Sequence, residues 1–213
     1  TGNMEPQKAA TEAVRETEGQ ILCQNGEAVE AYYFSTSAGV TSTDEIWGSD
    51  EAAPYLRSVP CKFDEEEPWS SWIVELPWKM LEDRIREKGE GTVLRSVAVT
   101  RRSESGAATA LEAVSDKDSC IIENEYEIRK FLAPVNCMIT EKDGTETAGG
   151  SLLPSAYFEL ERTQNGNLQV RGKGYGHGVG MSQTGADKMA EQGYDYREIL
   201  DYFFRNITVE NLG

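Results

Sequence analysis

The stretch Gly174-Tyr-Gly-His-Gly-Val-Gly-Met-Ser-Gln-Thr-Gly-Ala186 sets the plan of the chain around it and contains the only histidine of the sequence. Glycine stands at every second position from 172 to 180. Because glycine inside a strand or helix costs roughly 0.5–1 kcal/mol relative to alanine, this spacing predicts unusual dihedrals or a ligand against bare backbone. His177 adds a side chain that titrates near neutrality. The alternative is a tight loop whose histidine is satisfied by the backbone, and we favour a functional site.

The elements on either side place this run at the end of a strand. Residues 157–162 and 167–171 are predicted strands, joined through the turn Gln164-Asn-Gly-Asn167. Residues 183–192 then predict a helix, with Ser182 as its N-cap. The free N–H groups of this helix would face the glycine loop and form a site for an oxyanion, a carboxylate or a sugar oxygen.

The rest of the chain predicts a mixture of short helices and strands. Helical spacing of apolar residues occurs over 5–19, 78–88, 125–132 and 196–204. Strand patterns occur over 21–23, 28–34, 72–76, 93–101, 107–114 and 207–209, the first two forming an Asn-Gly hairpin. We therefore expect an α+β fold, with a largely antiparallel or mixed β core and short flanking helices, as a single domain over 1–213.

Charge and cysteine content narrow the class of partner. With 21 basic against 37 acidic side chains the net charge is −16, which argues against nucleic acid and against an anionic membrane surface. The acidic run Asp64-Glu-Glu-Glu67 predicts a solvated surface rather than a calcium site. Four widely spaced cysteines and one histidine predict no metal site, and we expect no cofactor. The four cysteines are compatible with two disulfides or with free thiols, and Cys120 and Cys137 are the pair closest in sequence.

Two further segments carry side chains of interest. The stretch Ser35-Thr-Ser-Ala-Gly-Val-Thr-Ser-Thr43 is either a solvated loop or a set of hydroxyl and backbone donors facing a ligand. All four tryptophans lie between residues 47 and 78. Core packing is the favoured interpretation for these rings, ahead of stacking on a sugar.

Several blocks of the sequence, in order, match a known family. They are Ala31-Tyr-Tyr-Phe-Ser-Thr-Ser-Ala-Gly39 with Thr41, Trp47-Gly48, Pro54-Tyr-Leu-Arg-Ser-Val59, Arg102-Ser-Glu-Ser-Gly106, Ile128-Arg129, Leu153-Pro-Ser155, and the glycine run as far as Gly193. With these blocks the chain resembles the stage II sporulation protein D and amidase-enhancer family of bacterial cell-wall proteins over nearly its whole length. Phe34 stands where family members often have histidine, and Ala38 where glycine is usual.

The resemblance implies a lytic transglycosylase, which cleaves the bond between N-acetylmuramic acid and N-acetylglucosamine in peptidoglycan and leaves a 1,6-anhydro end. A glutamate would protonate the leaving oxygen, and the sugar's own 6-hydroxyl would close on the anomeric carbon. In the family this glutamate lies in a block N-terminal to where this chain begins. The surroundings of Glu5, Glu12 and Glu16 resemble the stretch after that block, so the role is not assigned to them.

The candidate site residues follow from these motifs. His177 is the predicted catalytic residue, as proton acceptor for a sugar hydroxyl or hydrogen-bond donor to substrate. A plain helix cap is an equal alternative for Ser182, and Lys173 either meets a peptide carboxylate or is simply exposed. The predicted substrate-binding residues are Lys173, Tyr175, Ser182, Gln183, Ser35, Thr36 and Ser37.

Three functions are compatible with the sequence. The first is a peptidoglycan lytic transglycosylase domain, present as a partial chain and inactive if its glutamate is missing. The second is a non-catalytic cell-wall-binding or amidase-enhancing module. The third, independent of the family, is a hydrolase that uses Asp44 or Glu45 with His177. The expected partners are peptidoglycan glycan strands and, for the second function, a cell-wall amidase, at an extracytoplasmic location in the wall or on the outer face of the membrane.

Overall fold

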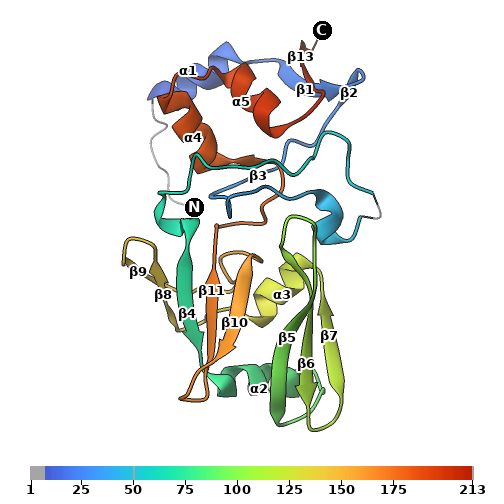
Figure 1. Cartoon of the computed structure of the whole chain (residues 1–213). Coiled ribbons are helices and arrows are strands. Elements are labelled where there is room, and N and C mark those ends of the chain that lie inside the picture. Colours follow the sequence, from blue (N-terminus) through green and yellow to red (C-terminus); the bar gives the residue numbers. More distant parts are fainter. Residues whose placement is uncertain (1–7, 50, 213) are drawn as a thin grey trace.

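The computed structural model describes residues 8–49 and 51–212, and its elements fall into two regions (Figure 1). We call the lower region in this view the sheet half. It contains β4 (Trp72–Leu76), α2 (Trp78–Glu87), β5 (Leu94–Arg102), β6 (Ala108–Ser115), β7 (Ser119–Glu123), α3 (Glu125–Phe131), β8 (Met138–Glu141), β9 (Glu146–Ala148), β10 (Phe158–Arg162) and β11 (Leu168–Gly172), with the 3-10 turn η2 (Pro68–Ser70).

The remaining elements form the motif half, in which the first and last strands pair. It contains α1 (Lys8–Glu16), β1 (Gln20–Gln24), β2 (Glu27–Ala28), β3 (Tyr33–Phe34), the 3-10 turn η1 (Asp44–Trp47), β12 (Met181–Ser182), α4 (Gln183–Glu191), α5 (Tyr196–Phe203) and β13 (Thr208–Asn211). β1 pairs antiparallel with both β13 and β2, so the last strand closes against the first. β12 pairs in parallel with β3.

Antiparallel ladders and an apolar core hold the sheet half together. One sheet has the strand order β10-β11-β4-β8-β9 and the other the order β5-β6-β7. Along β4, Trp72, Val74 and Leu76 are buried and the residues between them are exposed. These side chains join Leu81 and Ile85 of α2 in one apolar cluster. The alternation of β4 and the helical spacing of α2 thus bury complementary faces against each other.

A second apolar cluster lies in the motif half. Ile199 and Phe203 of α5 and Met189 of α4 pack there with Ile46 and Val179. Asp195 caps α5 and forms a reciprocal capping box with Glu198. The glycine run leaves the end of β11 and enters this cluster, so it connects the two halves (Figure 1).

The α+β class and most predicted elements are confirmed. The hairpins β5–β6 and β10–β11 pair antiparallel as expected, and Asn25 and Gly26 take the positive φ values of the predicted turn. The predicted helix 5–19 corresponds to α1 over the described residues, and its first residues lie outside them. Each of the other four predicted helices is present within one or two residues of its expected bounds.

The predicted strand 28–34 is wrong as a single element. β2 ends at Ala28 and β3 begins at Tyr33, with no strand between them. The start of this apolar run pairs with β1 and its end pairs with β12. Because these two partner strands lie in different places, the run forms two short strands instead of one. The strands β7, β8 and β9 were not predicted from the sequence. They are short and partly polar, and pairing with neighbours defines them rather than a strong pattern of their own.

Candidate functional site

The glycines of the motif press against the chain itself. Gly174, Gly176, Gly178 and Gly180 all have positive φ. A Cβ atom on Gly180 would lie 2.1 Å from the carbonyl oxygen of Tyr32, and one on Gly176 would lie 2.8 Å from Cβ of Phe34. The unusual dihedrals predicted from the spacing are therefore present. The group that approaches the bare backbone is the 32–38 segment of the same chain.

Backbone hydrogen bonds join this segment to the glycine run. The Tyr175 N–H donates to the Thr36 carbonyl (2.8 Å) and the Thr36 N–H to the Tyr175 carbonyl (3.1 Å). The Met181 N–H donates to the Tyr32 carbonyl at 3.0 Å. The two motif loops, far apart in sequence, thus converge in space.

A buried carboxylate, Asp64, fastens the two loops together. Its side chain accepts from the Ser37 N–H (2.8 Å), the Ser37 hydroxyl (2.7 Å) and the Ser182 hydroxyl (2.6 Å). The Thr184 hydroxyl (3.3 Å) and the Cys61 thiol (3.5 Å) complete the set. Burial raises the pKa of Cys61 to about 12, so this thiol stays protonated and able to donate. We call these five residues the Asp64 hub.

The Asp64 hub overturns part of the prediction for the acidic run. Asp64 is only 1% exposed, whereas Glu65 and Glu66 are exposed and Glu67 is half-buried. Solvated surface is therefore correct for the middle of the run and wrong at Asp64. A buried carboxylate is stable in this position because its oxygens receive several donors, which replace the hydrogen bonds of water.

The start of α4 is occupied by groups of the chain itself. The Ser182 hydroxyl accepts from the Gly185 N–H at 3.2 Å, which confirms Ser182 as the N-cap. The Thr184 N–H donates to the Ser35 carbonyl at 3.0 Å. Asp64 supplies a negative charge beside this helix N-terminus, where the macrodipole favours one. The N–H groups of Thr184 and Gly185, expected to bind an oxyanion, are thus satisfied within the chain by the Ser35 carbonyl and the Ser182 hydroxyl.

His177 is half-buried between aromatic rings. Its ring centroid lies 5.2 Å from that of Trp47 and 5.8 Å from that of Phe34. Nδ1 accepts a hydrogen bond from the Val179 N–H at 3.1 Å. Burial lowers the pKa of His177, and the charge of Arg129 lowers it further. The charge of Glu125 and a hydrogen bond with the Tyr33 backbone oppose the shift. The neutral imidazole is therefore favoured, with backbone groups as its polar partners.

Asp44 and Glu45, the carboxylates of the hydrolase hypothesis, lie in η1 with Trp47. Both accept hydrogen bonds from residues other than His177. The Ala53 N–H donates to Asp44 Oδ1 at 3.1 Å, and the Thr43 hydroxyl donates to Glu45 Oε2 at 2.8 Å. Within residues 8–49 and 51–212, no hydrogen bond links either carboxylate to His177. Of the glutamates considered on the opening helix, Glu12 and Glu16 are exposed on α1 and Glu5 lies outside the described residues.

Arg129 and Glu125 form a buried ion pair that lies behind the glycine run. The sequence did not indicate these two residues as part of the site. Arg129 Nη1 donates to Glu125 Oε1 at 2.5 Å, and its Nε and Nη2 donate to the carbonyls of Leu153 and Pro154. The Pro154 carbonyl also accepts from the Gly176 N–H at 2.8 Å. The spacing of four residues between glutamate and arginine in a predicted helix was the available signal, since such residues share one face.

The remaining predicted binding residues are on the surface. Tyr175 is 43% exposed, and its ring meets that of Trp69 edge-on with centroids 4.7 Å apart. Lys173 and Gln183 are exposed, whereas Thr36, Ser37 and Ser182 are buried and Ser35 is half-buried. The structure therefore divides the predicted residues into an exposed rim and a buried support.

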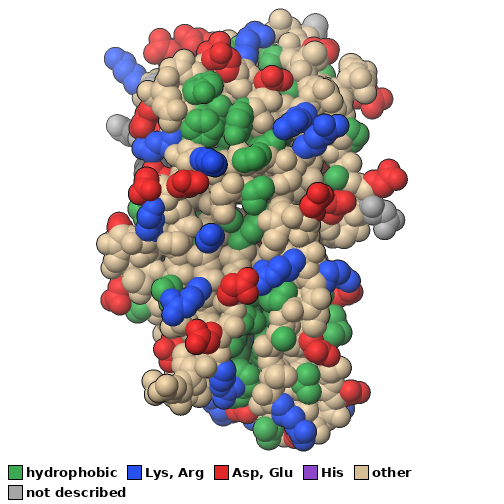
Figure 2. All heavy atoms as spheres, in the orientation of Figure 1, with side chains coloured by type: hydrophobic (Ala, Val, Ile, Leu, Met, Phe, Trp, Pro, Cys, Tyr) green, Lys and Arg blue, Asp and Glu red, His purple; other side chains and the backbone are tan. Residues whose placement is uncertain are grey.

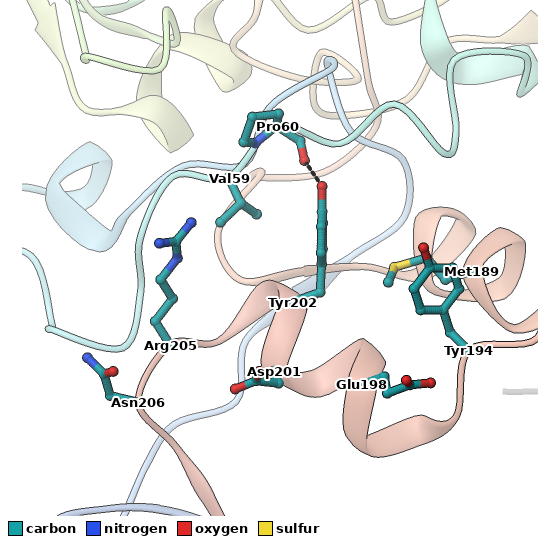
Figure 3. Close-up of a pocket in the computed structure, with 9 residues that line it drawn as sticks. All are labelled: Val59, Pro60, Met189, Tyr194, Glu198, Asp201, Tyr202, Arg205 and Asn206. Carbon is teal, nitrogen blue, oxygen red and sulfur yellow. Dashed lines mark hydrogen bonds between the residues drawn. The ribbon is translucent and has the colours of Figure 1, made fainter.

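Two open hollows lie in the surface near η1 and α5. One of about 560 Å³ borders η1, the β5–β6 turn and the start of α3, and its lining includes Trp47, whose ring contacts that of His177. Another of about 510 Å³ lies beside α5, where Tyr202 donates to the Pro60 carbonyl next to Arg205 (Figure 3). The second hollow includes none of the predicted site residues.

No group of three or more His, Cys, Asp or Glu side chains among residues 8–49 and 51–212 is arranged to hold a metal ion. All four cysteines are free, including Cys120 and Cys137. In the same part of the chain, each helix is too short or too polar to cross a membrane.

Comparison with known proteins gives a family. A family model described as "Domain of unknown function (DUF8618)" matches residues 55–180, more than half of the chain. The chain belongs to this family. It is also 31% identical over 202 residues to the stage II sporulation protein D of Bacillus amyloliquefaciens, and 30% identical over 203 residues to that of Bacillus subtilis strain 168. An amidase enhancer of the latter organism is 25% identical over 230 residues.

These relatives confirm the resemblance to the stage II sporulation protein D and amidase-enhancer family. The alignments cover 95% of this chain for each sporulation protein and 92% for the amidase enhancer. In the other direction, they cover 51% of each sporulation protein and 32% of the amidase enhancer. The chain thus spans about half or less of the length of these relatives.

Proposed function

We propose that this chain is a non-catalytic cell-wall-binding domain that attaches to peptidoglycan glycan strands and supports the work of a cell-wall amidase. The observation that carries the proposal is the division of the motif residues. Ser37, Ser182 and Thr184 are bonded to buried Asp64, whereas Lys173, Tyr175 and Gln183 are exposed on the surface that this hub makes rigid.

The exposed rim has the chemistry of a sugar-binding surface. Tyr175 offers an aromatic ring supported by Trp69, and its apolar face suits the C–H face of a sugar. Lys173 and Gln183 supply hydrogen-bond donors, and Gln183 an acceptor as well. Thr36 connects the two sides of this rim, because its backbone pairs with Tyr175 and its hydroxyl lies 3.3 Å from that of Thr184, next to Gln183. A rigid rim loses little freedom when it binds.

The same geometry argues against glycosidic cleavage by the described residues alone. Protonation of a glycosidic oxygen requires a carboxylic acid within hydrogen-bond reach of it. Asp64 and Glu125 are buried with partners of their own, and Asp44 and Glu45 accept hydrogen bonds elsewhere. Lytic transglycosylase activity would need an acid supplied from outside these residues.

The role beside an amidase follows from the relatives rather than from the rim. One relative is named amidase enhancer, and two others are named for a stage of sporulation. A domain that holds an amidase near glycan strands would raise the local concentration of its substrate. This work would take place in the bacterial wall or on the outer face of the membrane.

Pelleting with purified sacculi tests the proposal. We expect the chain to sediment with sacculi and Tyr175→Ala to weaken this binding roughly fivefold to tenfold, as for a truncated aromatic anchor. Tyr196→Ala is the matched control, because Tyr196 is also 43% exposed but lies on α5. Equal loss in both variants would contradict the rim. Release of anhydro-muropeptides by the chain would contradict the non-catalytic role, and failure to stimulate a wall amidase would contradict the enhancing one.

A further inference from the structure

A small cationic hollow lies where the two halves meet. Its volume is about 270 Å³, and its lining comes from residues 38–40, the β5–β6 turn at 102–106, the start of β10 and the end of β11. The charged side chains in this lining are those of Arg102, Arg171, Lys173 and Glu159. Three cations and one carboxylate make a locally positive site on a chain whose net charge is −16.

Two of these cations have no carboxylate partner in the part of the chain that the structure describes. Arg171 in β11 and Lys173 directly after this strand alternate with buried Val170 and Gly172, so both side chains lie on the exposed face of this segment. No ion pair among the described residues includes either of them. Glu159 lies opposite Arg171 in the ladder, but its carboxylate pairs with Arg102 at 2.9 Å. Figure 2 shows Lys and Arg side chains on this face near the upper ends of β10 and β11, with an acidic side chain among them.

The wall of the hollow is held in a fixed position. Arg102 donates to the carbonyls of Gly106 (3.1 Å) and Phe158 (2.8 Å). The Tyr157 hydroxyl lies 3.1 Å from that of Ser105, which also meets the hydroxyls of Ser42 and Ser103. Burial raises the pKa of Tyr157, so the phenol stays protonated and can donate. A wall of neutral donors thus stands beside two free cations.

We propose that this hollow binds a carboxylate of peptidoglycan through Arg171 and Lys173. Arginine offers a planar fork that matches a carboxylate, and lysine a second positive charge. The inference rests on the proposed function and deepens it. Lys173 lies two residues before Tyr175, so an acidic group bound here would adjoin a sugar stacked on the aromatic rim.

Two carboxylate sources have this chemistry. One is the lactyl group of muramic acid in a glycan without stem peptides, and the other is a carboxylate of the stem peptide itself. When a stem is attached, the lactyl group is an amide and carries no charge. Glycans with and without stems therefore distinguish the two sources.

Calorimetric titration with soluble glycans tests the proposal. The probes are a tetrasaccharide of alternating N-acetylglucosamine and N-acetylmuramic acid with free lactyl groups, the same glycan carrying tetrapeptide stems, and neutral chitotetraose. We expect at least one acidic probe to bind more tightly than chitotetraose. The double variant Arg171→Gln/Lys173→Gln should weaken that probe by about tenfold, the scale of a lost charge-assisted hydrogen bond.

The control carries the same charge change elsewhere. Arg95→Gln/Lys130→Gln removes one arginine and one lysine that are exposed in the sheet half, and it should leave the affinity unchanged. Equal affinity for chitotetraose and both acidic probes would overturn the carboxylate site, as would an equal loss in the two double variants. If the unaltered chain pellets with sacculi, Tyr175→Ala weakens that pelleting and the probes show no preference, the proposed function stands without this site. Preference for an acidic probe without sacculus binding would keep the site and contradict the wider function.

Discussion

The two halves of the molecule are stabilised in different ways. In the sheet half, strands pair along antiparallel ladders, interrupted by register shifts between β5 and β6, and their buried faces form one apolar cluster with α2 and α3. In the motif half, long loops run beside two very short strands, β3 and β12. These loops are tied by side-chain hydrogen bonds to Asp64 and by the close approach of glycines to the 32–38 segment.

The comparison shows how polar motif residues can be structural. A loop without a ladder must satisfy its buried backbone groups by other means, and hydroxyl and carboxylate side chains provide them. Ser37 and Ser182 fill this role because each bonds Asp64 from a different loop. Their presence in a motif therefore identifies the frame of the site, while the exposed neighbours Tyr175 and Gln183 are the groups available to a ligand.

Removal of the Asp64 carboxylate should have the largest effect. Asp64→Ala leaves the Ser37 N–H and the Ser37 and Ser182 hydroxyls without their acceptor, and we expect a loss of about 3–5 kcal/mol in the free energy of unfolding. This loss is comparable to the roughly 2–5 kcal/mol lost when a core leucine becomes alanine. Urea denaturation followed by circular dichroism measures it.

Its control is the neighbouring acidic residue. Glu65 is exposed, so Glu65→Ala should change the free energy of unfolding by no more than about 0.5 kcal/mol. If Asp64→Ala were as mild as Glu65→Ala, a polar hub would not hold the motif half, and the contrast between the two halves would fail.

A smaller effect is expected at the start of α4, where two adjacent residues have opposite roles. Ser182→Ala removes the N-cap and one donor to Asp64, which should cost about 1–2 kcal/mol of stability. Gln183→Ala should leave stability nearly unchanged and weaken sacculus binding. Thermal unfolding and pelleting with sacculi, measured on both variants, check that Ser182→Ala affects stability and Gln183→Ala affects binding. A stable Ser182→Ala protein that no longer pellets with sacculi would assign Ser182 to the ligand instead.

Most of the sheet half could be predicted from the sequence because its signals are local. Alternation defines β4, and Asn-Gly or Gly-containing turns define the hairpins β5–β6 and β10–β11. The strands that the sequence did not predict are those that form only because a neighbouring strand pairs with them, such as β9, which has only three residues. The break in the predicted strand 28–34 has the same origin, since its two ends pair in different places.

The site was predictable only in part. The glycine spacing indicated positive φ angles, and the serine loop indicated donors. Neither pattern showed that the two loops face each other through Asp64, because that carboxylate lies in an acidic run typical of solvated surface. Burial of one charge among exposed ones depends on tertiary contacts, and periodicity does not reveal it.

The smallest expected effect concerns His177, whose pKa responds to the charges of Glu125 and Arg129 in the sheet half. Burial lowers its pKa, so the folded chain binds fewer protons than the unfolded chain once the pH falls below about 6.5. Stability should therefore decrease as the pH falls through this region, by less than the Ser182 effect. Because the sequence has a single histidine, ¹⁵N–¹H correlation spectra report its pKa and tautomer directly.

We expect a pKa below 6.5 and a proton on Nε2, since Nδ1 accepts from the Val179 N–H. His177→Gln should reduce the difference in unfolding free energy between pH 7.5 and pH 5.5, a range above that in which exposed carboxylates titrate. A pKa at or above 6.5 would mean that the charge of Glu125 outweighs burial and the charge of Arg129. His177 would then belong electrostatically with the ion pair of the sheet half rather than with the buried loops of the motif half.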